Sequence, residues 1–282
     1  MSRQRTIDGV VAVEGVGFHA GKPVRARLRP GAVNSGIVFS VGGTDLPARP
    51  VHAVATPLAT ALEVKGVQIR MIEHLMSAVN GAAVDNLRIE VDGNELPILD
   101  GCGVAWSQAL ESAGIVEQDA VAQVLHMTEP IEVRDGARWA RLEPAAALEI
   151  DLTIAFDHAL VRRQRLVVKH SDGMYRRELA WARPFGLARL VPAMHRMGLG
   201  LGGSLDNTVV FDDHGPINPD GLRAPDEPVR HKVLDALGDL TVLSPRMNAR
   251  LIAEQPGRGL IVSVVQAAAT RPDSWVMRST RA

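Results

Sequence analysis

The sequence predicts an α+β fold made of two similar domains that arose by duplication. Residues 13–30 and 131–144 each have the pattern of a hairpin, with a glycine in the turn and a second strand that ends in Leu-x-Pro. The segments that start at His74 and His231 both continue with mostly apolar residues and reach a glycine seven residues later. Each histidine is therefore expected to open an equivalent helix. If the halves pack face to face, these helices meet at the interface, where small-molecule sites tend to lie.

The first half combines strands with two helices. The first helix is expected near residues 71–82, from the spacing of its apolar residues. The turn at residues 99–103 supplies the cap of the second helix, near residues 104–114. The strands are expected near residues 8–14, 23–30, 36–41, 60–70 and 86–92.

The second half repeats this order. A break near residues 117–120 separates a first domain, residues 1–118, from a second domain, residues 119–282. A helix is expected from about Glu227, and the type of the segments after it stays open. The strands are expected near residues 122–134, 137–144, 147–156 and 163–170, with further segments at 179–183 and 208–211.

Composition excludes several classes of protein. With 282 residues, 46% of them hydrophobic, the chain has enough apolar material for a large core. A net charge of −1 argues against nucleic-acid partners and anionic membrane surfaces, and basic clusters such as residues 162–165 are expected to coat solvated strands. No signal peptide or spanning run is recognisable, so a cytoplasmic protein is expected. The single cysteine, Cys102, excludes an intrachain disulfide.

A candidate metal site comes from two segments. His231 and Asp235 are four residues apart, so they share one face of a helix. Such a pair by itself is more often a hydrogen-bonded surface pair or a structural histidine. A catalytic zinc site needs a third protein ligand and an open position, and His74 supplies the ligand while the adjacent Glu73 can serve as a base.

Several stretches, in order along nearly the whole chain, match a known family. They are residues 15–22, 73–75, 85–90, 95–101, 185–186, 201–207 and 226–240. On these motifs the chain resembles the UDP-3-O-acyl-N-acetylglucosamine deacetylases, zinc amidases of lipid A synthesis. The resemblance implies helices sandwiched between two sheets, with zinc between the domains. It also implies release of acetate from a nucleotide sugar that carries an acyl chain.

The resemblance further implies roles for individual residues. The zinc ligands are His74, His231 and Asp235, and Glu73 is the general base. The other implied residues are Lys232, on the sugar or phosphate side, Asp239, which orients a neighbouring group, and Phe185, which contacts substrate.

The same resemblance places an insert in the second domain that forms a passage for the acyl chain. Its apolar residues also fit a helix that packs on the domain; they are Leu187, Leu190, Val191, Met194 and Met197. The glycine-rich residues 198–204 neither follow a clear strand nor open a helix, so a flexible turn is expected rather than a phosphate loop. His19, in a turn of the first domain, is expected to be structural.

Two residues depart from the family pattern. Pro184 stands where the family has a threonine beside the zinc, and proline offers no hydrogen-bond donor. Arg258 stands where the family has a histidine; it is expected to bind the substrate phosphate or the developing oxyanion. Three interpretations remain open: a working deacetylase, a paralogue that acts on another N-acyl amino sugar, and a protein that binds zinc or a nucleotide sugar without turnover.

Overall fold

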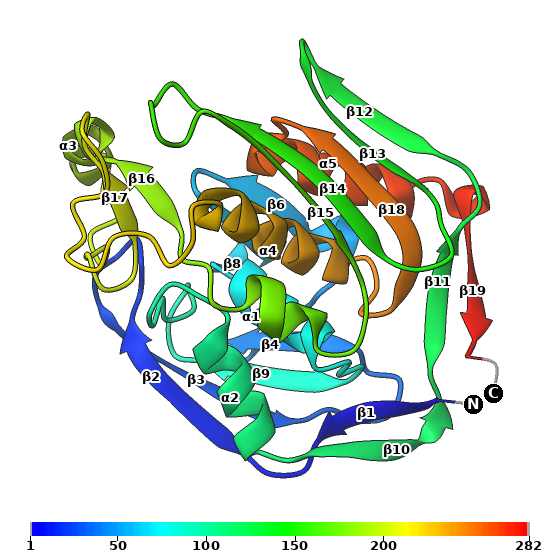
Figure 1. Cartoon of the computed structure of the whole chain (residues 1–282). Coiled ribbons are helices and arrows are strands. Elements are labelled where there is room, and N and C mark those ends of the chain that lie inside the picture. Colours follow the sequence, from blue (N-terminus) through cyan, green and yellow to red (C-terminus); the bar gives the residue numbers. More distant parts are fainter. Residues whose placement is uncertain (1, 281–282) are drawn as a thin grey trace.

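Two curved sheets enclose the main helices (Figure 1). A computed structural model describes residues 2–280, apart from the side chain of Arg258. The first half contributes one pair of helices and the second half another pair, and the two halves meet where α1 packs against α4. The α+β prediction, with helices between two sheets, is confirmed. The helices are α1 (Glu73–Gly81), α2 (Val104–Ser112), α4 (Glu227–Thr241) and α5 (Gly257–Ala269).

The first sheet has the order β2-β3-β9-β4-β5. Its central strand, β9, runs antiparallel to β3 and parallel to β4, while β2 and β5 are the antiparallel outer partners. Apolar side chains alternate along β3, so that Val24, Ala26 and Leu28 are buried. The strands are β2 (Val11–Val16), β3 (Pro23–Pro30), β4 (Ile37–Val41), β5 (Thr44–Pro47) and β9 (Leu87–Val91).

The second sheet repeats this construction in the order β12-β13-β18-β14-β15. Its central strand, β18, is again antiparallel to the second hairpin strand and parallel to the strand that follows the hairpin. Each of these strands in the second sheet therefore has the same neighbours, in the same relative directions, as the corresponding strand of the first sheet. Duplication of one unit predicts this topology. The strands are β12 (Ile131–Asp135), β13 (Arg138–Pro144), β14 (Glu149–Ala155), β15 (Arg163–Lys169) and β18 (Met247–Glu254).

Smaller elements extend these two units. β1 and β10 form an antiparallel ribbon, β11 and β19 add to the second sheet, and β16 and β17 are parallel strands of the insert. Short helical segments are α3 (Val191–Arg196) and the π-helical turn Tyr175–Leu179. The remaining strands are β1 (Arg3–Ile7), β6 (Ala53–Thr56), β7 (Ala59–Val64), β8 (Val67–Arg70), β10 (Ile115–Val121), β11 (Gln123–Met127), β16 (Phe185–Leu187), β17 (Val209–Phe211) and β19 (Trp275–Ser279).

Two predicted strands are each two strands in the structure. Residues 60–70 contain β7 and β8, because Lys65 and Gly66 both have positive φ, 52° and 79°, and form a tight turn. Residues 122–134 contain β11 and β12, with Pro130 between them. The first interruption is a tight hairpin turn, whereas the second lets β11 and β12 pair with different partners.

Two further local predictions were wrong, and one strand was missed. Residues 117–120 are not a break: they lie inside β10, which pairs with β1, a strand that was not expected. Residues 179–183 form no strand, because Leu179 ends the π-helical turn and residues 180–183 continue as a turn and irregular chain. The boundary between residues 118 and 119 stays a prediction.

A glycine allows α1 and α4 to approach closely. A Cβ atom at Gly238 would lie 2.0 Å from the carbonyl oxygen of Glu73. Glycine has no such atom, so the first turn of α1 rests directly on α4. Residues 73–80 are all buried, so this part of α1 presents no face to solvent, and its polar side chains are enclosed within the protein.

A partly buried ion pair also joins the two halves. Arg246, just before β18, contacts both carboxylate oxygens of Asp85, with distances of 2.7 Å from Nε to Oδ1 and 2.8 Å from Nη2 to Oδ2. Asn80 of α1 donates from Nδ2 to the carbonyl oxygen of Pro245 at 2.9 Å. Polar contacts of this kind fix the halves in one relative orientation.

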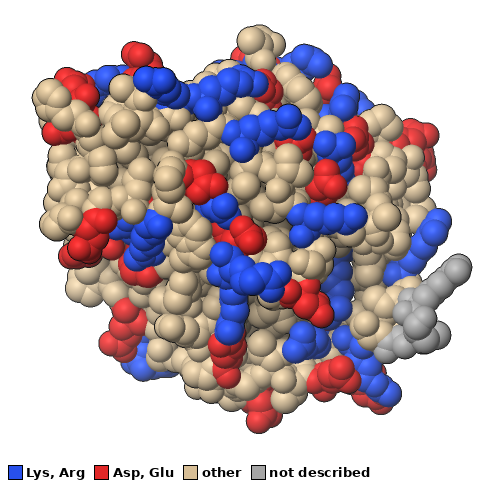
Figure 2. Space-filling view, viewed as in Figure 1, with Lys and Arg blue, Asp and Glu red and all other residues tan. Residues whose placement is uncertain are grey.

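Charges of both signs are interspersed on the face drawn in Figure 2. Two basic residues at the start of β15 are exposed and paired: Arg163 contacts Glu254 and Arg165 contacts Asp151. Within residues 2–280, no helix has both the length and the apolar composition needed to cross a bilayer.

Candidate metal centre

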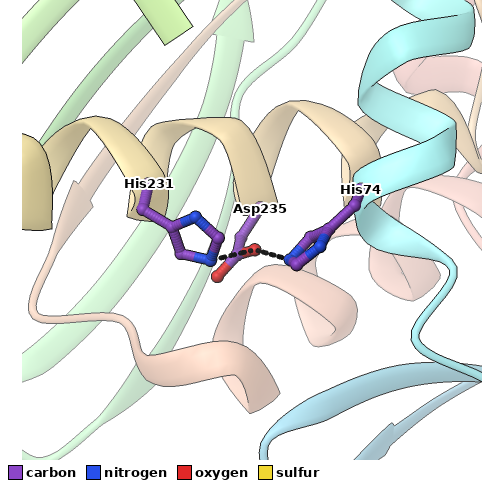
Figure 3. A group of neighbouring side chains, drawn as sticks. All are labelled: His74, His231 and Asp235. Atoms are coloured by element: carbon purple, nitrogen blue, oxygen red, sulfur yellow. Dashed lines mark ion pairs between the residues drawn. The ribbon is translucent and has the colours of Figure 1, made fainter. Parts of the chain in front are cut away.

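Three buried side chains converge where α1 meets α4. One ligand atom from each of His74, His231 and Asp235 lies within 4.8 Å of the other two. Figure 3 shows both imidazole rings turned toward the carboxylate. Asp235 Oδ1 lies 3.5 Å from His74 Nε2 and 3.3 Å from His231 Nε2, and ligand atoms on a tetrahedral zinc ion are about 3.3 Å apart, given bonds of about 2.0–2.1 Å. Two nitrogens and one carboxylate oxygen at this spacing therefore fit zinc.

The two histidines occupy different positions in their helices. His74 is the second residue of α1, but His231 lies in the second turn of α4, which begins at Glu227. The prediction that each histidine opens an equivalent helix was therefore wrong for His231. The two glycines also differ. Gly81 is the last residue of α1, but Gly238 lies inside α4, where it packs against the backbone of α1.

His231 is held neutral and in one tautomer. Its Nδ1 donates to the carbonyl oxygen of Ala182 at 3.0 Å, so Nε2 carries the lone pair that points at Asp235. Burial lowers the pKa of His231 to about 3, against the opposing attraction of the Asp235 carboxylate. A neutral imidazole with its free nitrogen directed into the cluster is the form that binds metal.

Glu73 and Asp239 lie in the wall of the same cavity and are joined by one residue. Glu73 is fully buried, and its Oε2 accepts from the backbone N–H of Thr60 at 3.1 Å. The hydroxyl of Thr60 donates to Asp239 Oδ1 at 2.6 Å. The sequence contains no signal for Thr60, because a threonine inside a strand is an ordinary β residue.

Lys232 contacts a metal-ligand candidate directly. Its Nζ donates to Asp235 Oδ2 at 3.0 Å, whereas both histidines face the other carboxylate oxygen, Oδ1. The same Nζ lies 5.8 Å from the centroid of the Phe185 ring. Both residues line the cavity. Contact of Lys232 with sugar or phosphate stays a prediction.

The cavity has a volume of ≈ 1000 Å³ and continues from the cluster into the insert. Four of the five apolar residues expected in the acyl passage line it, while Met197 lies outside with 66% of its surface exposed. The four are Leu187, Leu190, Val191 and Met194.

Two glycine-containing turns close one side of this cavity. Leu201 donates its backbone N–H to the carbonyl oxygen of His19, and Gly202 does the same to Phe18 at 2.9 Å. The His19 side chain is buried, and its backbone N–H donates to the Glu95 carboxylate at 2.9 Å. Residues 198–204 are therefore a turn, as expected, but one that is anchored to the first half of the chain.

Two residues depart from the family pattern, and the structure describes the side chain of only one of them, Pro184. Pro184 lines the cavity beside Phe185. Arg258 belongs to the first turn of α5 by sequence, and its side chain lies outside the described part of the structure. Its contact with an anion therefore stays a prediction.

Comparisons with known proteins agree with one another. Residues 4–269 match the family model described as UDP-3-O-acyl N-acetylglycosamine deacetylase. A curated protein of Acidithiobacillus ferrooxidans, named UDP-3-O-acyl-N-acetylglucosamine deacetylase, is 40% identical over 281 residues, which cover 98% of this chain and 92% of that protein.

Proposed function

The chain belongs to the UDP-3-O-acyl-N-acetylglucosamine deacetylase family and is a deacetylase, and we propose that it uses zinc to hydrolyse the N-acetyl group of a UDP-3-O-acyl-N-acetylglucosamine in lipid A synthesis. The observation that carries this proposal is the convergence of ligand atoms from His74, His231 and Asp235 within 4.8 Å. Glu73 lies in the wall of the same cavity.

His74, His231 and Asp235 would hold the ion. A bound zinc ion polarises an amide carbonyl and makes water acidic enough to lose a proton near neutral pH. Three protein ligands leave the fourth position open, which is the arrangement of catalytic rather than structural zinc sites.

Glu73 is proposed to move the proton. Its carboxylate accepts a proton from the attacking water as the new C–O bond forms, and returns it to the amine as the C–N bond breaks. Acetate and a free amino sugar are the products. The N–H of Thr60 donates to Oε2 of Glu73 and so orients the carboxylate, while Asp239 is held by the hydroxyl of the same residue.

The rest of the cavity fits the substrate of the named relative. Apolar walls from Leu187, Val191 and Met194 suit an acyl chain. Lys232 is the cation proposed on the sugar or phosphate side, and Arg258 is proposed to bind an anion.

Pro184 favours a second candidate, a paralogue that acts on another N-acyl amino sugar. A proline in the cavity wall removes a donor that the family pattern implies and changes the wall's shape. A binding protein without turnover is the weaker interpretation, because a binding site has no use for the buried base Glu73 beside a ligand.

Mass spectrometry of the products tests the function. Wild-type protein should convert UDP-3-O-acyl-N-acetylglucosamine to the free amine and acetate, a chelator should stop this reaction, and added zinc should restore it. Full activity in metal-free protein would exclude zinc, and conversion of only other N-acyl amino sugars would favour the paralogue.

Two variants separate metal binding from proton transfer. Glu73→Gln keeps the shape of the side chain, so the protein should retain zinc by elemental analysis while its turnover falls by roughly 10²- to 10⁴-fold. His231→Ala should lose most of its zinc. Turnover close to wild type in Glu73→Gln would assign the proton transfer to another group.

A further inference from the structure

We propose that the buried Arg183–Glu227 ion pair is a positioning device for His231 that acts through one peptide group. The proposal rests on the proposed zinc site and concerns residues that lie outside it. Arg183 directly precedes Pro184 in the cavity wall, and Glu227 begins α4.

The peptide group between Ala182 and Arg183 is bound at both ends by α4. Its carbonyl oxygen accepts from His231 Nδ1 at 3.0 Å, and its N–H donates to Glu227 Oε1 at 3.0 Å. Glu227 and His231 are one helical turn apart on the same face. Because a peptide group is planar and rigid, the carboxylate that holds its N–H also fixes the direction of its carbonyl.

The ion pair holds this peptide group against the helix. Arg183 Nε lies 2.9 Å from Glu227 Oε1, and the two side chains are 6% and 1% exposed. Arg183 Nη2 also donates to Glu227 Oε2 at 3.2 Å and to the carbonyl oxygen of Gly221 at 2.8 Å. The backbone N–H of Arg223 donates to Glu227 Oε2 at 2.7 Å. Glu227 thus connects two separate segments to the start of α4.

Other hydrogen bonds hold the neighbouring groups of this segment: the N–H of Ala182 donates to the carbonyl oxygen of Leu179 at 2.9 Å, and the carbonyl oxygen of Pro184 accepts from the N–H of Val209 at 2.8 Å. Pro184 has no N–H to donate, and it restricts Arg183 to extended conformations. A buried ion pair also contributes little net stability compared with apolar packing, because both charges lose their hydration. The role of this ion pair is geometric. It positions the carbonyl oxygen of Ala182, and that oxygen fixes the tautomer and the ring direction of His231.

The test measures zinc affinity by competition with a chelator of known affinity, without reference to turnover. Arg183→Met removes the guanidinium and keeps a side chain of similar length. We expect zinc affinity to fall about 10- to 100-fold, as for other groups that orient a metal-bound histidine. Glu227→Met should behave in the same way, while Arg183→Lys should restore part of the affinity, since lysine keeps the charge but not the fork.

Arg246→Met is the matched control. It breaks another largely buried arginine–carboxylate pair, with Asp85, that also joins distant segments but has no contact with the peptide group of Ala182. Thermal unfolding of the metal-free variants identifies any general loss of stability. Only the Arg183 and Glu227 variants should lose zinc affinity, and only they should change the absorption spectrum of the cobalt-substituted protein.

The outcomes distinguish this inference from the proposed function. Wild-type protein that binds no zinc would overturn both. Wild-type protein that binds zinc, together with unchanged affinity and an unchanged cobalt spectrum in Arg183→Met, would overturn the positioning role alone. If Arg183→Met fails to fold, Glu227→Gln tests the positioning role instead. It keeps the shape of the side chain and an acceptor oxygen, so it should lose less zinc affinity than Glu227→Met.

Discussion

At the scale of single residues, the wall of the cavity contains a proline where the family pattern has a donor. Pro184 can donate no hydrogen bond, so on the proposed mechanism the oxyanion that forms during amide hydrolysis would have one partner fewer. If this chain acts on the acylated UDP-sugar without that donor, Pro184→Thr combined with Arg258→His should raise kcat. A restored oxyanion donor accounts for an increase of up to roughly 10²- to 10³-fold.

Steady-state kinetics on that substrate check this prediction. Pro184→Ala with Arg258→His is the control, because it removes the ring without adding a hydroxyl. A fall in the rate on another N-acyl amino sugar, with no gain on the lipid A precursor, would instead favour the paralogue. Unchanged rates on both substrates would place Arg258 outside the site.

At the scale of elements, two helical glycines should respond in opposite ways to alanine. Gly238→Ala places a Cβ atom against the backbone of Glu73 at 2.0 Å, and since backbone atoms cannot give way locally, α1 and α4 must separate. We expect a loss of about 1–3 kcal/mol or more in the free energy of unfolding. Gly259→Ala in α5 meets no atom within 4 Å, so it should stabilise the protein by up to about 1 kcal/mol.

Urea unfolding of both variants tests this pair of predictions. Gly238→Ala should also weaken zinc binding, because the separation moves His74 away from His231 and Asp235. Equal stability of the two variants would contradict the close approach of the helices.

The second sheet should lose stability in acid through Asp151 of β14. Hydrogen bonds from Arg165 chiefly, and from Arg250, hold the pKa of this carboxyl group below its usual value of 3.8, although burial opposes the shift. A carboxyl group whose pKa is lowered by folding contributes stability above the unfolded pKa. That contribution should disappear as the pH falls below 3.8 and through the lowered pKa of the folded state.

Asp151→Asn should therefore be less stable than wild type at pH 7, and the difference should shrink in acid. Unfolding in urea across this pH range provides the measurement. Asp45→Asn is the control, because Asp45 also pairs with an arginine but is half exposed, and exposed pairs contribute little. A constant difference between Asp151→Asn and wild type at every pH would mean that ionisation of Asp151 is not involved.

At the scale of the whole molecule, a zinc ion would connect the two halves. His74 comes from α1 of the first half, and the other two ligands come from α4 of the second half. Because a ligand that binds only the folded state stabilises it, zinc at 1,000 times its Kd should add about 4 kcal/mol. Chelation should lower Tm in wild type and in Glu73→Gln, but not in His231→Ala; an unaltered wild-type Tm would argue against a zinc ion that joins the halves.

The sequence by itself determined the features that depend on short-range patterns. The two glycine-turn hairpins, the helices α1, α2 and α4, and the pairing of His231 with Asp235 follow from periodicity and spacing over a few residues. The repeated pattern and the family motifs then predicted two similar units with His74 at their interface, and the three residues do meet there.

Only the tertiary structure decided the contacts between segments that are distant in the chain. Thr60 bonds to Asp239 across 179 residues, and β1 pairs with β10 from the other end of the first half. The carbonyl of Ala182 that fixes the His231 tautomer is a backbone group, and every residue has one. Such partners leave no pattern in sequence, because their identity depends on how whole elements pack against each other.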